Sequence, residues 1–108
     1  MVVADVAGAV AFLRDVFDAS GEVQSGRPVE VDLRGLTIMV SAAGERELFP
    51  AFLYVYVDDA DAAFVRAMTA GARSIEDPVD TFYGDRRAMV EDPSGNVFQI
   101  AHRRERGF

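Results

Sequence analysis

The sequence contains neither cysteine nor lysine. Without cysteine, the chain has no disulfide framework, no thiolate zinc site and no thiol nucleophile. Without lysine, it has no amine to form a Schiff base with a carbonyl substrate. All 11 residues in the Lys and Arg count are arginine, and there is one histidine. These absences remove several common forms of catalysis before any motif is considered.

The chain also lacks a general basic field and a long apolar run. Its formal net charge is -7, which argues against nucleic-acid binding. We interpret the one basic cluster, Arg103, Arg104 and Arg106, as a solvated terminus. No apolar run approaches the roughly 18 residues of a membrane helix. The segment from Met1 to Ala11 has no basic flank, so we expect no secretory signal and a cytoplasmic location.

Two helices are predicted from apolar spacing and from the residues that begin and end them. A chain of 108 residues has the size of one domain. Asp5 is a candidate N-cap for a helix to about Phe17, and Asp58 or Asp59 for a helix to about Ala70 that stops at Gly71. The first buried face is predicted to be Val6, Ala9, Val10, Leu13, Val16 and Phe17, and the second Ala60, Phe64, Val65 and Met68.

The two halves of the sequence read as copies of one unit. Ala11-Phe12-Leu13-Arg14 and Ala63-Phe64-Val65-Arg66 match at an offset of about half the chain, which suggests duplication. Strand candidates precede and follow each helix: Met1 to Ala4, Glu22 to Gln24, Val29 to Arg34, Leu36 to Ala42, Ala51 to Val57, Arg73 to Glu76, Asp85 to Glu91 and Asn96 to Arg103. The sequence therefore predicts an α+β fold with two βαβββ modules, at about 1–43 and 51–108.

Strand alternation assigns side chains to the two faces of the predicted sheet. In the segment from Ala51 to Val57, the aromatic residues Phe52, Tyr54 and Tyr56 alternate with aliphatic ones. We expect the aliphatic set to pack under the helices, which leaves the aromatic rings on the opposite face.

Other residues are expected to share that aromatic face. Gln99 lies on it by parity, and Thr37, Met39 and Ser41 are its counterparts in the first half. Together they could form an aromatic, partly polar wall for a planar or amphipathic small molecule. Packing between two chains, or against the other half of the sheet, explains the aromatic residues equally well.

The second half resembles a known family. Its motifs are Tyr54-Val55-Tyr56-Val57-Asp58-Asp59-Ala60-Asp61, Ala70-Gly71-Ala72, Tyr83-Gly84-Asp85-Arg86 and Asp92-Pro93-Ser94-Gly95-Asn96-Val97-Phe98-Gln99-Ile100. They are similar to those of the vicinal oxygen chelate superfamily of glyoxalases, bleomycin-resistance proteins and extradiol dioxygenases, and most of all to its PhnB-like members. The resemblance implies that the two modules form a curved mixed sheet around a cleft, which is usually completed by dimerisation. In the enzymes of the family, this cleft holds a divalent metal bound by His and Glu.

The metal ligands implied by the resemblance are not present in this chain. The histidine ahead of the Val-Asp-Asp motif falls on Phe52, the glutamate of the last strand falls on Gln99, and the first-strand histidine would fall at or before Met1. A phenyl ring offers no lone pair, and a neutral amide is a poor ligand beside a carboxylate. No cofactor is therefore predicted, and no catalytic residue is assigned.

The leading hypothesis is a metal-free small-molecule binding protein, sequestering a drug or metabolite in the cleft of a homodimer. The acidic balance is compatible with a cationic ligand. One alternative is a metal-dependent lyase, isomerase or dioxygenase that recruits unfamiliar ligands, Glu30, Asp32, Glu91 or Gln99. The other is a protein-interaction module whose aromatic face is filled by a partner.

Three further side chains carry specific expectations. His102 has the wrong strand parity to join Gln99, so we expect it at the surface or on the helix side. Asp85 and Arg86 are expected to form a structural pair, while Arg87 points to the other face and could bind an anionic ligand bidentately. A short first strand would leave a sheet edge exposed, which also favours a dimer.

Overall fold

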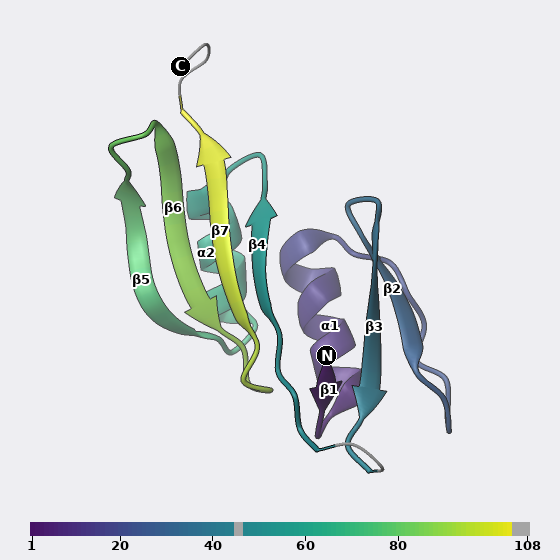
Figure 1. Cartoon of the computed structure of the whole chain (residues 1–108). Coiled ribbons are helices and arrows are strands. Elements are labelled where there is room, and N and C mark those ends of the chain that lie inside the picture. The colour runs from purple at the N-terminus through teal and green to yellow at the C-terminus, as the bar shows by residue number, and fades with distance from the viewer. Residues whose placement is uncertain (45–46, 105–108) are drawn as a thin grey trace.

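The computed structural model describes residues 1–44 and 47–104, and it contains two helices and seven strands within that part of the chain (Figure 1). In chain order the elements are β1 (Val2–Val3), α1 (Val6–Phe17), β2 (Val29–Leu33), β3 (Leu36–Ala42), β4 (Phe52–Tyr56), α2 (Ala60–Thr69), β5 (Arg73–Asp80), β6 (Asp85–Glu91) and β7 (Val97–Arg103). None of the helices in these ranges is long and apolar enough to cross a membrane.

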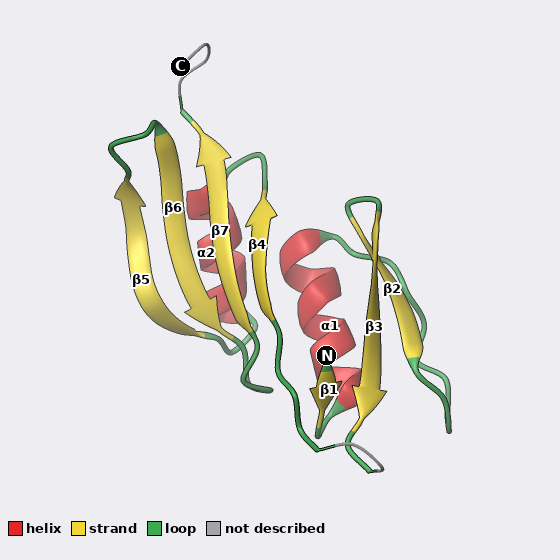
Figure 2. Cartoon of the chain, in the orientation of Figure 1, coloured by secondary structure: helices red, strands yellow, loops and turns green. Residues whose placement is uncertain are grey.

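The strands form two mixed sheets with orders β1-β3-β2 and β4-β7-β6-β5. Each sheet contains one parallel pair, β1 with β3 and β4 with β7, and its other pairs are antiparallel. The two helices lie behind the sheets and leave the opposite face of both sheets open (Figures 1 and 2). The predicted α+β fold of two related modules is confirmed, including its short first strand.

The first module is less complete than its sequence suggests. The strand expected at Glu22 to Gln24 does not form, and only Ser20 makes an isolated bridge, to Asp32 of β2. The segment from 22 to 28 is exposed throughout, so it has no apolar side to bury against the core. It also contains Pro28, which has no N–H to donate to a ladder.

Helix α1 follows the prediction closely. The Asp5 carboxylate accepts a hydrogen bond from the Gly8 amide at 2.9 Å, which caps the helix. Phe12 is buried in addition to the expected residues, and its ring stacks on that of Phe98 with centroids 5.4 Å apart. Phe17 packs against the same ring at 5.2 Å, so Phe98 of β7 anchors α1 to the second sheet.

The predicted buried face of α2 is partly wrong. Asp59 is the N-cap as expected, but the buried residues are Ala60, Ala63 and Ala67, while Val65 is 61% exposed. Met68 is also exposed. Small alanine side chains let the helix backbone approach the sheet closely, so the larger residues turn outward. The positions of apolar residues in the sequence could not show which side of α2 is buried, because alanines lie on one side of the helix and larger apolar residues on another.

Two turns position the strands of the sheets. Arg34 and Gly35 both adopt positive φ, 53° and 88°, in the two-residue hairpin between β2 and β3. Between β6 and β7, the Asp92 carboxylate accepts hydrogen bonds from the backbone amides of Ser94 and Asn96. Asn96 is fully buried, and its side-chain oxygen accepts the Ala51 amide at 2.8 Å. The turn thus holds the start of β4 against β7.

Candidate ligand-binding face

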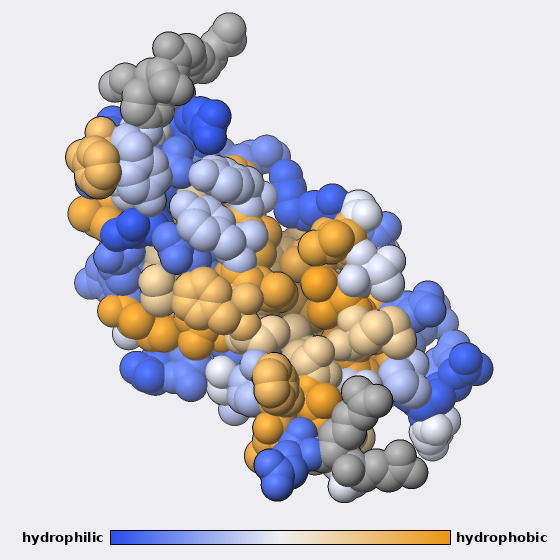
Figure 3. Space-filling view, viewed as in Figure 1, coloured by the Kyte–Doolittle hydropathy of each residue, from blue (hydrophilic) through white to orange (hydrophobic). Residues whose placement is uncertain are grey.

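An aromatic strip lies on the open face of the second sheet. Phe52, Tyr54 and Tyr56 of β4 are 62%, 45% and 46% exposed, while Val55 between them is buried under the helices. This alternation confirms the predicted assignment of faces. Apolar surface runs across the middle of the open side, between the two sheets (Figure 3).

Strand β7 supplies the neighbours of the aromatic strip. Its parallel register with β4 pairs Tyr54 with Gln99 and Phe52 with Val97. Phe52 and Gln99 are therefore diagonal neighbours on one face of adjacent strands. The two positions at which we expect the metal ligands of family enzymes to fall thus lie close together. Their donor chemistry does not suit a metal, because they supply a phenyl ring and a neutral amide. In residues 1–44 and 47–104, no group of three or more His, Asp or Glu side chains could hold a metal ion.

The tyrosines of the strip form a cluster beside a buried acid. The rings of Tyr54 and Tyr56 stack with centroids 5.3 Å apart. Burial raises the pKa of Tyr54 well above its ordinary value, and hydrogen bonding with the hydroxyls of Tyr56 and Tyr83 adds to this effect. The Tyr56 hydroxyl donates to Asp85 Oδ2 at 2.8 Å. Asp85 is almost completely buried, so this bond is shielded from water.

Arg87 also belongs to this face. Its guanidinium binds Glu76 through Nε at 2.8 Å and Nη2 at 3.0 Å, and its Nη1 donates to the Tyr83 hydroxyl at 3.1 Å. The hydrogen bonds to Glu76, and then to Tyr83, raise the pKa of Arg87 above its ordinary value. Bidentate binding of an anionic ligand by Arg87 stays a prediction. The ligand would have to compete with the Glu76 carboxylate, which already binds the guanidinium through two nitrogens.

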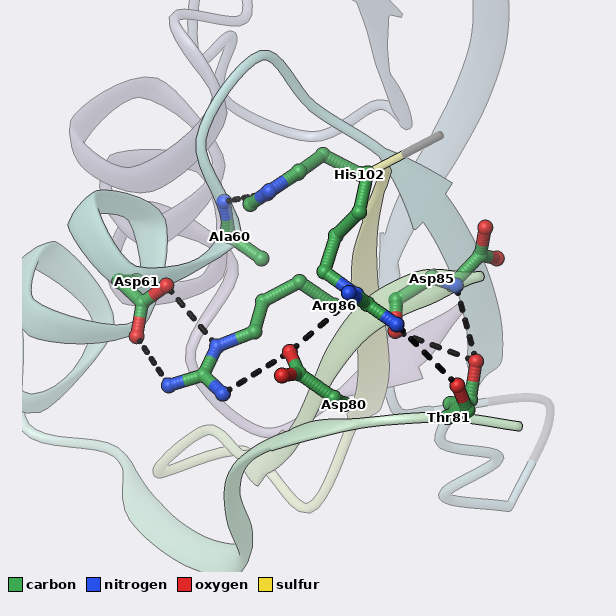
Figure 4. Close-up of polar contacts among 8 residues, drawn as sticks. Ala60, Asp61, Asp80, Thr81, Asp85, Arg86 and His102 are labelled. Carbon is green, nitrogen blue, oxygen red and sulfur yellow. Dashed lines mark hydrogen bonds and ion pairs between the residues drawn. The ribbon is translucent and has the colours of Figure 1, made fainter. Parts of the chain in front are cut away.

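The expected pairing of Asp85 with Arg86 is wrong. Arg86 turns to the helix side, where it makes two bonds to the Asp61 carboxylate, at 3.0 and 3.1 Å, and one to Asp80 at 3.1 Å (Figure 4). Neighbouring strand residues point to opposite faces, so Asp85 lies on the open side with Tyr56. Asp85 also has the Arg103 Nε 3.8 Å from its carboxylate.

The single histidine is on the helix side, as predicted. His102 Nδ1 accepts the Ala60 amide at 2.7 Å and so caps the first turn of α2 (Figure 4). Of the tail cluster, Arg104 pairs with Asp80 at 3.3 Å, and Arg106 lies outside the described residues.

The remaining predicted residues lie on the other sheet. Met39 and Thr37 of β3 are exposed, and antiparallel pairing places Glu30 and Asp32 of β2 opposite them on the same face. Met39 and Glu30 contribute to a hollow of about 400 Å³ whose other lining residues are Glu22, Gln24, Arg27, Pro28 and Val29. The predicted site residues are thus divided, with Thr37 and Met39 on the first sheet and the rest on the second.

Two members of the site were missed from the sequence. Asp85, at the start of β6, accepts the Tyr56 hydroxyl, and Tyr83, in the turn before β6, accepts a hydrogen bond from Arg87. Both residues belong to the Tyr83-Gly84-Asp85-Arg86 motif, so the sequence did contain a sign of their importance. It could not be interpreted without the register of β6 against β7, which places Asp85 opposite Arg103 and within reach of Tyr56.

Comparison with known proteins places this chain and its fold in a family. The model of the Glyoxalase/Bleomycin resistance protein/Dioxygenase superfamily matches residues 1–100. An uncharacterized protein from Mycobacterium bovis is 33% identical, over 93% of this chain and 78% of the relative. TioX from Micromonospora sp. ML1 superposes with a TM-score of 0.81 at 24% identity, covering 95% of this chain and 94% of TioX. A family enzyme from Burkholderia phytofirmans PsJN gives 0.78 at 24% identity, over 94% and 93%. The chain belongs to the Glyoxalase/Bleomycin resistance protein/Dioxygenase superfamily.

Proposed function

We propose that this chain binds a small molecule without a metal and sequesters it against the aromatic strip, in a cleft that a second copy of the chain completes. The proposal rests mainly on the side chains at the two positions where we expect family enzymes to have metal ligands. Phe52 and Gln99 lie together on the open face, where they offer stacking surface and a neutral amide. The similarity to PhnB-like members stays part of this proposal.

The aromatic strip suits a planar ligand. Aromatic side chains present large rigid surfaces that stack with ring centroids about 4.5–7 Å apart. Phe52, Tyr54 and Tyr56 stand in one row and are 45% exposed or more, although water contact with apolar rings is unfavourable. A ligand that covers these rings would remove that contact.

The homodimer is proposed because of exposed apolar surface and an incomplete sheet edge. Strand β1 has only two residues, and β2 gains one bridge on its outer side. Close to β1, Leu48 and Phe49 are 58% and 74% exposed, and with Met1, Val2 and Glu47 they line an apolar hollow of about 490 Å³. Sedimentation equilibrium should give a dimer, and a monomer at micromolar concentration would contradict a shared cleft.

A thermal-shift screen of metabolites and antibiotics tests binding, since a ligand of the folded state raises the melting temperature. A hit should stabilise the wild type and a Val65→Ala control, whose change lies on the outer side of α2. It should not stabilise Tyr54→Ala. A hit that stabilises all three proteins equally would bind elsewhere and contradict the proposal.

Metal analysis of protein purified without chelator separates this function from metal-dependent chemistry. Substoichiometric metal is expected, because Glu91 is held by Arg73 at 2.6 Å and the Gln99 amide is a weak ligand. Stoichiometric metal that disappears in Glu30→Ala, Glu91→Ala or Gln99→Ala would establish the alternative, a lyase, isomerase or dioxygenase with unfamiliar ligands.

A further inference from the structure

The hydrogen of the Tyr56 hydroxyl is committed inside the protein. It is donated to the buried Asp85 carboxylate at 2.8 Å. The Asp85 oxygen is the acceptor in this bond, so the Tyr56 hydroxyl has no hydrogen left to donate. The part of the Tyr56 oxygen that remains available on the open face is therefore a lone pair, which accepts a hydrogen bond from a ligand.

Tyr83 has the opposite arrangement. Its hydroxyl oxygen accepts a hydrogen bond from Arg87 Nη1 at 3.1 Å. A guanidinium only donates, so this bond does not use the hydrogen of the Tyr83 hydroxyl, which can be donated to a ligand acceptor. Two hydroxyls of one cluster thus have opposite hydrogen-bonding character, set by a buried acid on one side and an arginine on the other.

Tyr54 stands beside Tyr56 on the same face, with ring centroids 5.3 Å apart. Burial raises the pKa of Tyr54, so its hydroxyl stays neutral. A neutral hydroxyl can rotate and either donate or accept. The Tyr54 hydroxyl can therefore adapt to either a donor or an acceptor on the ligand. Tyr56 and Tyr83 instead determine where the ligand must carry a donor and where it must carry an acceptor.

The charged groups around the cluster cancel in pairs. Arg87 is bound to Glu76 at 2.8 Å, Arg73 to Glu91 at 2.6 Å, and Arg103 lies 3.8 Å from Asp85. The chain as a whole carries a net charge of -7, but these acids and bases on the open face of the second sheet balance one another. The local field therefore offers a cationic ligand little advantage over a neutral one.

Resting on the function proposed above, we propose that the ligand is an uncharged planar heteroaromatic molecule that carries a hydrogen-bond donor and an acceptor on one edge, as a ring lactam does. Its N–H would face the Tyr56 oxygen and its carbonyl would accept the Tyr83 hydrogen, while its ring stacks on the strip formed by Tyr54 and Phe52. The acidic composition suggested a cationic ligand, but the charges close to the cluster are paired, and we therefore expect an uncharged one.

Four bicyclic probes of similar size separate these requirements in NMR titrations of the full chain. Carbostyril carries both a donor and an acceptor, N-methylcarbostyril only the acceptor, indole only the donor, and N-methylquinolinium a positive charge. Carbostyril should bind the wild type most tightly. Each missing hydrogen bond should weaken binding about three- to tenfold, the effect of one neutral hydrogen bond.

Two variants test the assignment of each hydroxyl. Tyr56→Phe should weaken carbostyril and indole about three- to tenfold and leave N-methylcarbostyril unchanged. Tyr83→Phe should weaken carbostyril and N-methylcarbostyril and leave indole unchanged. Val65→Ala, on the outer side of α2, should alter none of these affinities.

The outcomes distinguish the ligand class from the function itself. Tighter binding of N-methylquinolinium than of carbostyril overturns the uncharged ligand. Equal binding of all four probes, lost in Tyr54→Ala, overturns the hydrogen-bonding selection and leaves the binding face in place. Failure of every probe to shift amide resonances of β4 and β7 at millimolar concentration overturns both. If dilution from dimer to monomer strengthens carbostyril binding, a second copy covers the face and the proposed occupant is wrong.

Discussion

Asn96 is the residue whose replacement should most clearly disturb the aromatic strip without touching it. It is fully buried, and its side chain makes two hydrogen bonds. The side-chain oxygen accepts the Ala51 amide at 2.8 Å, and the side-chain nitrogen donates to Asp92 Oδ2 at 2.9 Å. These bonds join the turn after β6 to the start of β4, which carries Phe52.

Asn96→Ala leaves a backbone amide and a buried carboxylate oxygen without these partners. An unsatisfied amide costs about 1–3 kcal/mol, and a lost bond to a charged group costs about 1.5–3 kcal/mol. We therefore expect a loss of about 3–5 kcal/mol, a large share of the roughly 5–15 kcal/mol typical of a domain. The melting temperature should fall by roughly 12 °C or more.

Urea denaturation followed by circular dichroism measures this loss, and Asn96→Asp is the matched control. The aspartate keeps an acceptor for the Ala51 amide but places a second carboxylate beside Asp92. Its destabilisation should be larger at neutral than at acidic pH, because like charges repel only while both groups are ionised. A loss below about 1 kcal/mol in Asn96→Ala would refute the reasoning, since it would mean that water satisfies both exposed partners.

Three further predictions concern the helix layer that supports the sheet. Ala63→Leu should lower the free energy of unfolding by about 1–3 kcal/mol through overpacking, whereas Val65→Ala should change it little. His102→Phe removes the acceptor of the first amide of α2 and should cost about 0.5–2 kcal/mol in urea denaturation. Hydrogen bonding to Arg86 lowers the pKa of Asp61, so that contribution is present above the ordinary carboxyl pKa and is lost as the pH falls through the lowered value. Arg86→Met should therefore flatten the acid limb of a plot of stability against pH.

Each of these predictions has a contrary result. Equal losses in Ala63→Leu and Val65→Ala would mean that α2 does not pack through its alanines. An unchanged denaturation midpoint in His102→Phe would show that another group satisfies the helix amide. An Arg86→Met protein whose stability falls as steeply in acid as that of the wild type would show that Asp61 does not depend on this arginine.

Much of the fold could be predicted because strand alternation and helix-capping residues in the sequence match the secondary structure that forms. The alternation in β4 fixed which side chains share a face, since successive strand residues point to opposite sides. Asp5 and Asp59 marked the helix starts, because their carboxylates reach amides that the first turn leaves free. Parity also placed His102 on the helix side. These features depend only on residues close together in the chain.

Other features depended on contacts that no local pattern encodes. The buried face of α2 was misassigned, because close packing on the sheet favours Ala63 over the larger Val65. The partner of Arg86 was misassigned, because Asp61 lies on a helix that only the crossover brings to β6. The strand expected at Glu22 to Gln24 failed for lack of an apolar side to bury.

The sequence by itself determined the family and the repeated strand and helix pattern, and it predicted that Phe52 and Gln99 stand where family enzymes have metal ligands. Only the tertiary structure decided that Tyr56 is tied to Asp85 and Tyr83 to Arg87, and so which of these hydroxyls donates and which accepts. The reason is physical. Residue identity fixes which atoms a side chain carries, but the partner of a hydroxyl depends on strand register and turn geometry, which arise only when segments far apart in the chain pack together.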